Sequence, residues 1–141
     1  MYGRILVTLD TSPADRGVLA HVAQLAAVHG SRVLLLHVAD GWAARHFDTL
    51  DLVESEEMKA DRAYLEAEAA NLRAGGIQVE VRLAHGDPPS EILKAAEQEA
   101  CDLIAMSSHG HRFLADLILG STIEAVRHRA RVPLLVVRAE K

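Results

Sequence analysis

Apolar and polar residues follow two patterns along this chain: short unbroken apolar runs and longer stretches with helical periodicity. The apolar runs occupy residues 4–10, 32–40, 101–108 and 132–138. Such runs are typical of strands that are covered on both faces of a sheet. Residues 77–83 instead alternate strictly between apolar and polar, which predicts an edge strand with one face in water.

Helical periodicity fills the segments between these five predicted strands. Residues 12–29 predict a helix with Ser12 as its N-cap, Pro13 in its first turn and Gly30 just past its end. Further helices are predicted at residues 55–74, within 86–100 and at 121–130, the last beginning at Gly120 or Ser121. Residues 41–54 have no clean period and predict only a connection.

Strands that alternate with helices predict a parallel sheet with helices on both faces. The chain has 141 residues and contains no linker or internal repeat, so we expect one domain that spans residues 1–141. Proline cannot donate to a sheet ladder, so Pro133 places the fifth strand at an edge.

Polar residues end the first and the fourth predicted strands, with Thr8 and Asp10 on one and Ser107 on the other. In open parallel sheets, ligands bind beyond the carboxyl ends of the strands, where the strand order reverses. If the chain winds one way through three strands and then returns, strands one and four are neighbours, and Asp10 and Ser107 flank one crevice. Asp10 precedes Thr-Ser-Pro, so a residue that only shapes the turn is the other interpretation.

The stretch "MSSHGHRFLADLILGST", residues 106–122, follows the fourth strand and carries Gly110 and Gly120 with nine residues between them. Glycines let backbone N–H groups approach a ligand, and a helix that begins near Gly120 would direct free N–H groups at a phosphate. The spacing of the glycines is compatible with a phosphate site and equally with a plain surface loop. The stretch is neither a Walker loop nor a dinucleotide fingerprint.

Composition narrows the classes of function. The formal net charge of −5 argues against a nucleic-acid partner bound through a basic surface. No apolar run approaches the roughly 20 residues that a membrane helix needs, and the first residues contain no signal-peptide core, so a cytoplasmic protein is expected. Cys101 is the single cysteine, which fits a reducing compartment and predicts a small buried residue at a strand start.

Three histidines and one tryptophan have side chains that could bind a metal or contact a base. His109 and His111 lie two apart in a loop without an acidic or thiol neighbour, so loop residues are favoured over a zinc site. His37 lies in an apolar run and is expected to be a core histidine whose ring is hydrogen-bonded. Trp42 is either a base-stacking residue or an apolar plug over the crevice.

Five blocks of the chain resemble the universal stress protein family in order and spacing: "ILVTLDTS", "LLLHVAD", "GDPPSEILKAAEQEACDLIAMSSHG", "LILGSTIEAV" and "RARVPLLVVR". Nucleotide-binding members of that family carry glycine, two residues, glycine, nine residues, then glycine with serine or threonine. Gly110, Gly120 and Ser121 match this motif, but Ser107 stands in place of its first glycine. That serine would either crowd the phosphates or donate one more hydrogen bond.

The resemblance implies a three-layer α/β domain with a five-stranded parallel sheet of order 3-2-1-4-5. It also implies a role for each matching residue. Thr8 would lie near the base and ribose, and Asp10 would contact the ribose or a phosphate-bound cation. The backbone of Val38 would contact the adenine edge, with Met106 packed nearby. The residues implied to cradle the phosphates are Ser107, Gly110, Gly120, Ser121 and Thr122.

By the same resemblance, the protein is expected to bind ATP or AMP, with Mg²⁺ as a candidate cation, and to act as a dimeric sensor in a stress response. The apolar run from Val132 to Val137 lies on a predicted edge, and pairing with a second copy would protect it. A slow Mg-dependent ATPase or phosphotransferase is one alternative. A nucleotide-free member that acts through protein partners is the other.

Overall fold

The structure is a computed structural model that describes residues 1–39, 56–108 and 113–139, without the side chains of 113–120. The strands are β1 (Arg4–Thr8), β2 (Arg32–Ala39), β3 (Gln78–His85), β4 (Leu103–Ser108) and β5 (Leu134–Arg138). The helices are α1 (Asp15–His29), α4 (Glu56–Ala74), α5 (Pro88–Gln98) and α6 (Phe113–Arg129). Strands and helices alternate along the described chain, as the sequence pattern predicts.

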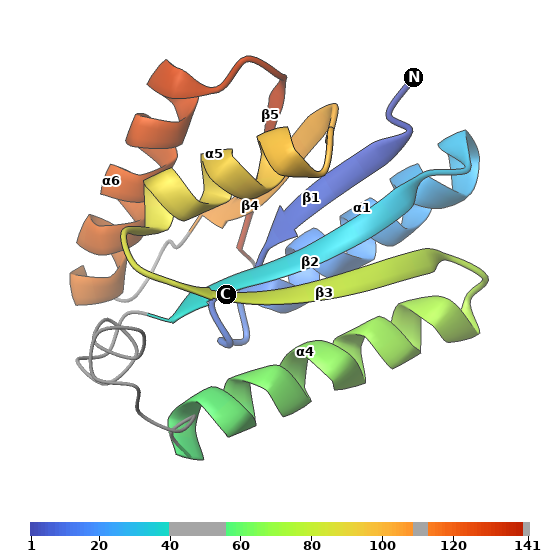
Figure 1. Ribbon diagram of the computed structural model, residues 1–141, viewed down its shortest axis with the longest axis horizontal. Helices are drawn as coiled ribbons and strands as arrows, with labels where there is room; N and C mark the ends of the chain where they lie inside the picture. Colours follow the sequence, from blue (N-terminus) through green and yellow to red (C-terminus); the bar gives the residue numbers. More distant parts are fainter. Residues whose placement is uncertain (40–55, 109–112, 140–141) are drawn as a thin grey trace.

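The five strands form one parallel sheet in the order β3-β2-β1-β4-β5 (Figure 1). This confirms the predicted fold class and strand order. The two expected edge strands, β3 and β5, lie at the edges. Strand β1 is central, and its neighbours are β2 on one side and β4 on the other.

Two hydrophobic clusters lie on opposite faces of the sheet. Helices α1 and α4 cover one face, and α5 and α6 cover the other (Figure 1). Successive side chains of β1 point to alternate clusters, with Ile5 and Val7 in the first and Leu6 in the second. All three are fully buried, which explains the unbroken apolar run in the sequence.

Two predicted helix starts are wrong. Helix α1 begins at Asp15 rather than after Ser12, because a hydrogen-bonded turn, with Asp15 N–H donating to Ser12 O at 3.0 Å, precedes it. Helix α6 begins at Phe113, so Gly120 and Ser121 lie within it. The segment before Gly120 contains three leucines and an alanine, which are strong helix formers, and an interior glycine costs only about 1 kcal/mol.

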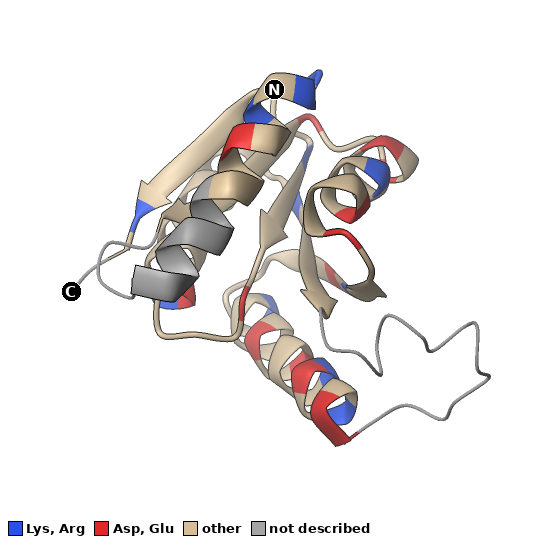
Figure 2. Cartoon of the chain, turned by 90° about the vertical axis from the view of Figure 1, so that its left-hand side faces the viewer, with Lys and Arg blue, Asp and Glu red and all other residues tan. Residues whose placement is uncertain are grey.

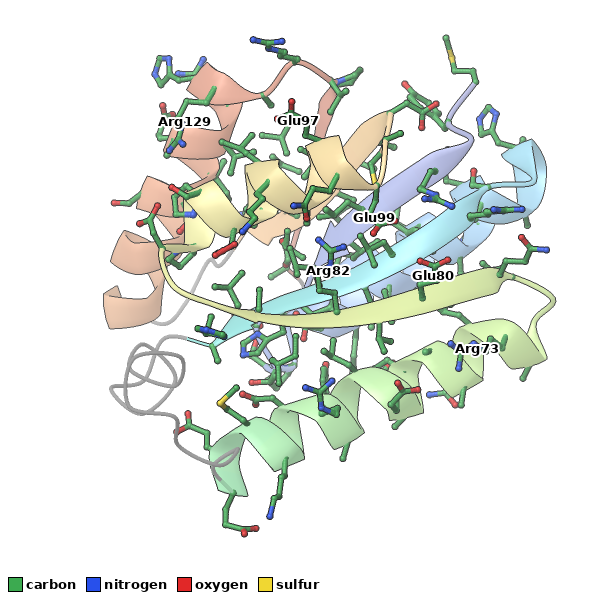
Figure 3. The ribbon with its side chains drawn as sticks, in the orientation of Figure 1. Arg73, Glu80, Arg82, Glu97, Glu99 and Arg129 are labelled. Atoms are coloured by element: carbon green, nitrogen blue, oxygen red, sulfur yellow. The ribbon has the colours of Figure 1, made fainter. Side chains whose placement is uncertain are left out.

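Charged side chains secure the edge of the sheet opposite to the carboxyl ends of the strands. Arg4 of β1 lies 3.1 Å from the carboxylate of Glu99, just past the end of α5. Arg82 of β3 lies 2.6 Å from the same carboxylate (Figure 3). Along α4, acidic and basic residues are interspersed on the exposed surface (Figure 2), which is typical of a solvated helix face. The two ion pairs of Glu99 join the end of α5 to β1 and β3.

Candidate functional site

The candidate site lies where the strand order reverses, between the carboxyl ends of β1 and β4. The two strands pair directly, with Val7 opposite Ala105, although they are far apart in sequence. The expectation that strands one and four are neighbours is therefore confirmed. Thr8 ends β1, and Ser107 and Ser108 end β4, so polar side chains from both strands meet at one edge of the sheet.

A chain of hydrogen bonds links Ser107 to Asp10. The Ser107 hydroxyl donates to Ala14 O at 3.2 Å, and Ala14 N–H donates to the Ser12 hydroxyl at 3.2 Å. The Ser12 hydroxyl in turn donates to Asp10 Oδ1 at 2.6 Å. Asp10 and Ser107, singled out in the sequence as flanking residues, thus belong to one network across the start of α1.

The turn that connects β1 to α1, residues 10–12 (the β1–α1 turn), directs its own N–H groups inward. The N–H groups of Asp10 and Thr11 donate to the carboxylate of Asp15, at 3.1 and 2.9 Å. Ser12 N–H donates to Asp10 Oδ1 at 3.1 Å. These three amides are already used, so the turn is not a phosphate nest; it offers carboxylate oxygen, an acceptor for a hydroxyl group or a cation.

Asp15, which the sequence analysis did not single out, carries a buried carboxyl group beside this turn. Its exposure is 1%, and burial raises its pKa to about 7. The hydroxyl of Tyr64, on α4, donates to Asp15 Oδ2 at 2.7 Å, and burial together with the carboxylate raises the pKa of Tyr64. Acidic residues are common in the first turn of a helix, so the sequence around Asp15 gives no sign of a special role. Its hydrogen bond to Tyr64, far along the chain, is what distinguishes it.

The other predicted strand residues lie near the end of β1 in different environments. Val38 is half-buried and packs on the cluster beneath α5 and α6. Met106 is 2% exposed, so its side chain belongs to the core. The ring of His37 is hydrogen-bonded, as expected: Nδ1 lies 2.7 Å from Leu9 O, and Nε2 lies 3.4 Å from the carboxylate of Asp61.

The glycine-rich loop is only partly described. Gly110, with His109, His111 and Trp42, lies outside the described residues. Gly120, Ser121 and Thr122 lie inside α6, so their amides are not those of a helix N-terminus, contrary to the prediction. Ser121 is exposed and Thr122 is 5% exposed. The hydroxyl of Ser121 is therefore the group that this part of α6 presents to solvent.

Two general features complete the description. Within residues 1–39, 56–108 and 113–139, no group of three or more His, Cys, Asp or Glu side chains is arranged to hold a metal ion. Among the helices of that same part, none has the length and apolar character to cross a membrane. Cys101 is 5% exposed just before β4, which confirms the prediction of a buried residue, and burial raises its pKa to about 11.

Comparison with known proteins places these features in a family context. The sequence profile of the universal stress protein family matches residues 1–138. The universal stress protein MJ0577 of Methanocaldococcus jannaschii is 32% identical over 155 aligned residues, which cover 98% of this chain and 96% of the relative. The solved structure of MJ0577 superposes with a TM-score of 0.84 at 30% identity, covering 100% of this chain and 99% of that one.

Two more distant structures share the fold and contain ligands. A universal stress protein in complex with cAMP has a TM-score of 0.72 at 19% identity, covering 99% of this chain and 98% of its own. The universal stress protein of Archaeoglobus fulgidus in complex with dAMP has a TM-score of 0.71 at 20% identity, covering 96% and 98%. At these identities the likeness establishes a common architecture.

Proposed function

The chain belongs to the universal stress protein family, and from this premise we propose that it binds an adenine nucleotide, ATP or AMP, and acts as a dimeric sensor of that nucleotide. The relatives solved with cAMP and with dAMP support an adenine nucleotide as the class of ligand. The proposed site is the edge where β1 and β4 end.

The observation that carries the proposal is the acceptor-rich β1–α1 turn at the switch point of the sheet. Its three amides donate within the protein, so the turn contributes acceptors rather than donors, and the carboxylate of Asp10, which also accepts from Ser12, is the acceptor proposed to contact the ligand. Ribose hydroxyls are donors of the kind that a carboxylate at a switch point binds. Thr8 is proposed to lie near the base and ribose, and the backbone of Val38 is proposed to contact the adenine edge. The buried side chain of Met106 packs nearby.

The phosphates are proposed to lie away from Asp10, toward the end of β4 and α6. Asp10 and Asp15 place two carboxyl groups beside the β1–α1 turn, and an ionised carboxylate repels a phosphate. The family motif supports Gly110, Gly120, Ser121 and Thr122 as phosphate contacts, with Ser107 at the position of its first glycine. Mg²⁺ is proposed to reach the site with ATP, held by the phosphates.

A dimer through β5 is the second part of the proposal. Strand β5 pairs with β4 on one side and forms the sheet edge on the other. Val136 on this strand is 42% exposed, and an apolar edge strand is an aggregation hazard unless it is covered. Pairing of β5 with β5 of a second copy across a two-fold axis would cover it.

Calorimetric titration with AMP and with ATP, with and without Mg²⁺, tests the nucleotide site. Asp10→Asn keeps the Oδ1 acceptor for Ser12 but removes the negative charge, so we expect affinity to fall about 10- to 100-fold, the equivalent of one charged hydrogen bond. Asp102→Asn is the control, because the Asp102 carboxylate also accepts hydrogen bonds within the protein, from Gly3 N–H and Arg4 N–H, but lies just before β4 at the amino end of the strands.

The outcomes separate the three candidate functions. Binding by wild type that weakens in Asp10→Asn and not in Asp102→Asn supports the sensor. Phosphate release from ATP that scales with protein concentration and is lost in Asp10→Asn would favour the slow ATPase. Absence of binding, with no nucleotide released from the denatured protein, would leave the member that acts through protein partners.

A further inference from the structure

The carboxylate of Asp15 accepts hydrogen bonds from three donors outside its own helix. It accepts from Asp10 N–H, from Thr11 N–H and from the Tyr64 hydroxyl, at 3.1, 2.9 and 2.7 Å. A carboxylate in the first turn of a helix usually stays in water, where it interacts with the helix dipole at little cost. At 1% exposure, Asp15 carries a desolvation cost that its helix does not need.

The two amides that Asp15 accepts belong to the β1–α1 turn, whose central residue has an unusual backbone. Thr11 has φ of +64°, in the left-handed region that β-branched residues rarely adopt. Such a conformation persists only where the surroundings impose it. The hydrogen bonds from Asp10 N–H and Thr11 N–H to the one carboxylate of Asp15 supply that constraint.

Tyr64 connects this constraint to α4. Its hydroxyl donates to the same oxygen, Asp15 Oδ2, that accepts from Thr11 N–H, and its ring packs on the cluster beneath α1 and α4. One turn earlier on α4, Asp61 lies 3.4 Å from His37, whose other ring nitrogen contacts Leu9 O. Helix α4 thus contacts the segment around Asp10 through two half-buried side chains, Asp61 and Tyr64.

We propose that Asp15, supported by Tyr64, is a positioning residue of the nucleotide site that holds the β1–α1 turn in the conformation presenting Asp10. This inference rests on the proposed function, since it assigns a role toward the same ligand. Asp15 itself does not contact the nucleotide; its carboxylate is used by the turn and by α4.

The test uses two readouts on the intact protein: calorimetric titration with AMP and ATP, and amide exchange of Asp10 and Thr11 measured without nucleotide. In Asp15→Asn, an NH₂ group replaces one acceptor, so we expect affinity to fall about tenfold and exchange of the Thr11 amide to accelerate by a similar factor. Tyr64→Phe removes one donor and keeps the ring, so a smaller change of the same sign is expected.

Arg73→Met is the matched control on α4. Arg73 ties α4 to β3 by donating to Val79 O at 2.6 Å, remote from the β1–α1 turn (Figure 3). Arg73→Met should lower the stability of the protein without changing its nucleotide affinity or the exchange rate of the Thr11 amide. A rescue variant adds Thr11→Gly to Asp15→Asn, because glycine adopts positive φ without steric cost and should recover part of the affinity.

The outcomes distinguish the inference from the proposed function. Wild type that binds nucleotide, together with unchanged affinity in Asp15→Asn and Tyr64→Phe, would overturn the positioning role and leave the function standing. If wild type binds neither nucleotide, the function fails, and the exchange rates alone decide whether Asp15 holds the turn. An equal loss of affinity in Arg73→Met would reduce the effect to general destabilisation and overturn the inference.

Discussion

At the scale of single residues, Ser107 is the position at which this chain departs from its family's glycine motif. Its hydroxyl is 3.2 Å from Ala14 O and 3.4 Å from Ser108 O, and the residue is 7% exposed. The sequence left two interpretations, crowding of the phosphates or an extra donor for them. The geometry supports a third, in which the serine ties the end of β4 to the start of α1.

Ser107→Ala isolates this tie. We expect it to lower the free energy of unfolding by about 1 kcal/mol, the net value of one hydrogen bond, and to leave nucleotide affinity unchanged. Ser107→Gly should cost roughly 0.5–1 kcal/mol more, because glycine weakens a strand interior. Urea denaturation and calorimetry measure the two quantities. Weaker nucleotide binding in Ser107→Ala at unchanged stability would show instead that the hydroxyl donates to the ligand.

Long-range partners explain which site residues could be found from the sequence. Thr8, Asp10 and Ser107 were found because each lies at the end of an apolar run, and strand ends are where parallel sheets bind ligands. Asp15 was missed because its significance lies in Tyr64, 49 residues further along the chain. No local pattern encodes that contact, since it forms only when α4 packs beside α1.

At the scale of elements, helix boundaries follow local chemistry where a strong cap is present. The start of α5 was predicted from the Gly-Asp-Pro-Pro break. There Gly86 has φ of +128°, and Asp87 caps the helix by accepting from the N–H and hydroxyl of Ser90, at 3.2 and 2.6 Å. The start of α6 was not predicted, because Gly120–Ser121 imitates a cap inside a segment of strong helix formers.

The cap of α5 gives a measurable prediction. Asp87→Ala should lower the free energy of unfolding by about 1 kcal/mol, because the Ser90 N–H loses its acceptor. Ser90→Ala keeps that N–H and removes only an exposed hydroxyl, so a few tenths of a kcal/mol are expected. Urea denaturation of both variants provides the comparison. Equal effects would mean that the side-chain bond, rather than the capped amide, stabilises the helix.

At the scale of the whole molecule, the pattern of apolar runs was sufficient to predict the sheet. Four continuous runs and one alternating run became strands of a parallel sheet, and the alternating run became the edge strand β3. The alternation of strands and helices fixed the layers, and the family resemblance supplied the strand order. What the pattern could not supply is the state of assembly, which depends on the exposed edge of β5.

A charge on the exposed edge of β5 should dissociate the proposed dimer into monomers. We expect the wild-type protein to sediment as a dimer, and Val136→Asp to shift it to monomer, because the buried interface would contain an unpaired carboxylate. Val28→Asp is the control, since Val28 is 79% exposed on α1 and lies outside the proposed interface. Analytical ultracentrifugation measures both. A monomeric wild type, or a dimer that survives Val136→Asp, would contradict pairing through β5.

The adjacency of β1 and β4 also sets a timetable for synthesis. Asp10 leaves the ribosome early, but Ser107 follows about 100 residues later, a delay of about 5–20 s at ordinary rates of elongation. During that interval β1 can pair with β2 on one side, but its other side has no partner until β4 has been made. A nascent or truncated chain therefore has half of the proposed binding edge. If the proposed site is correct, nucleotide can stabilise the protein only after β4 and α6 have been made.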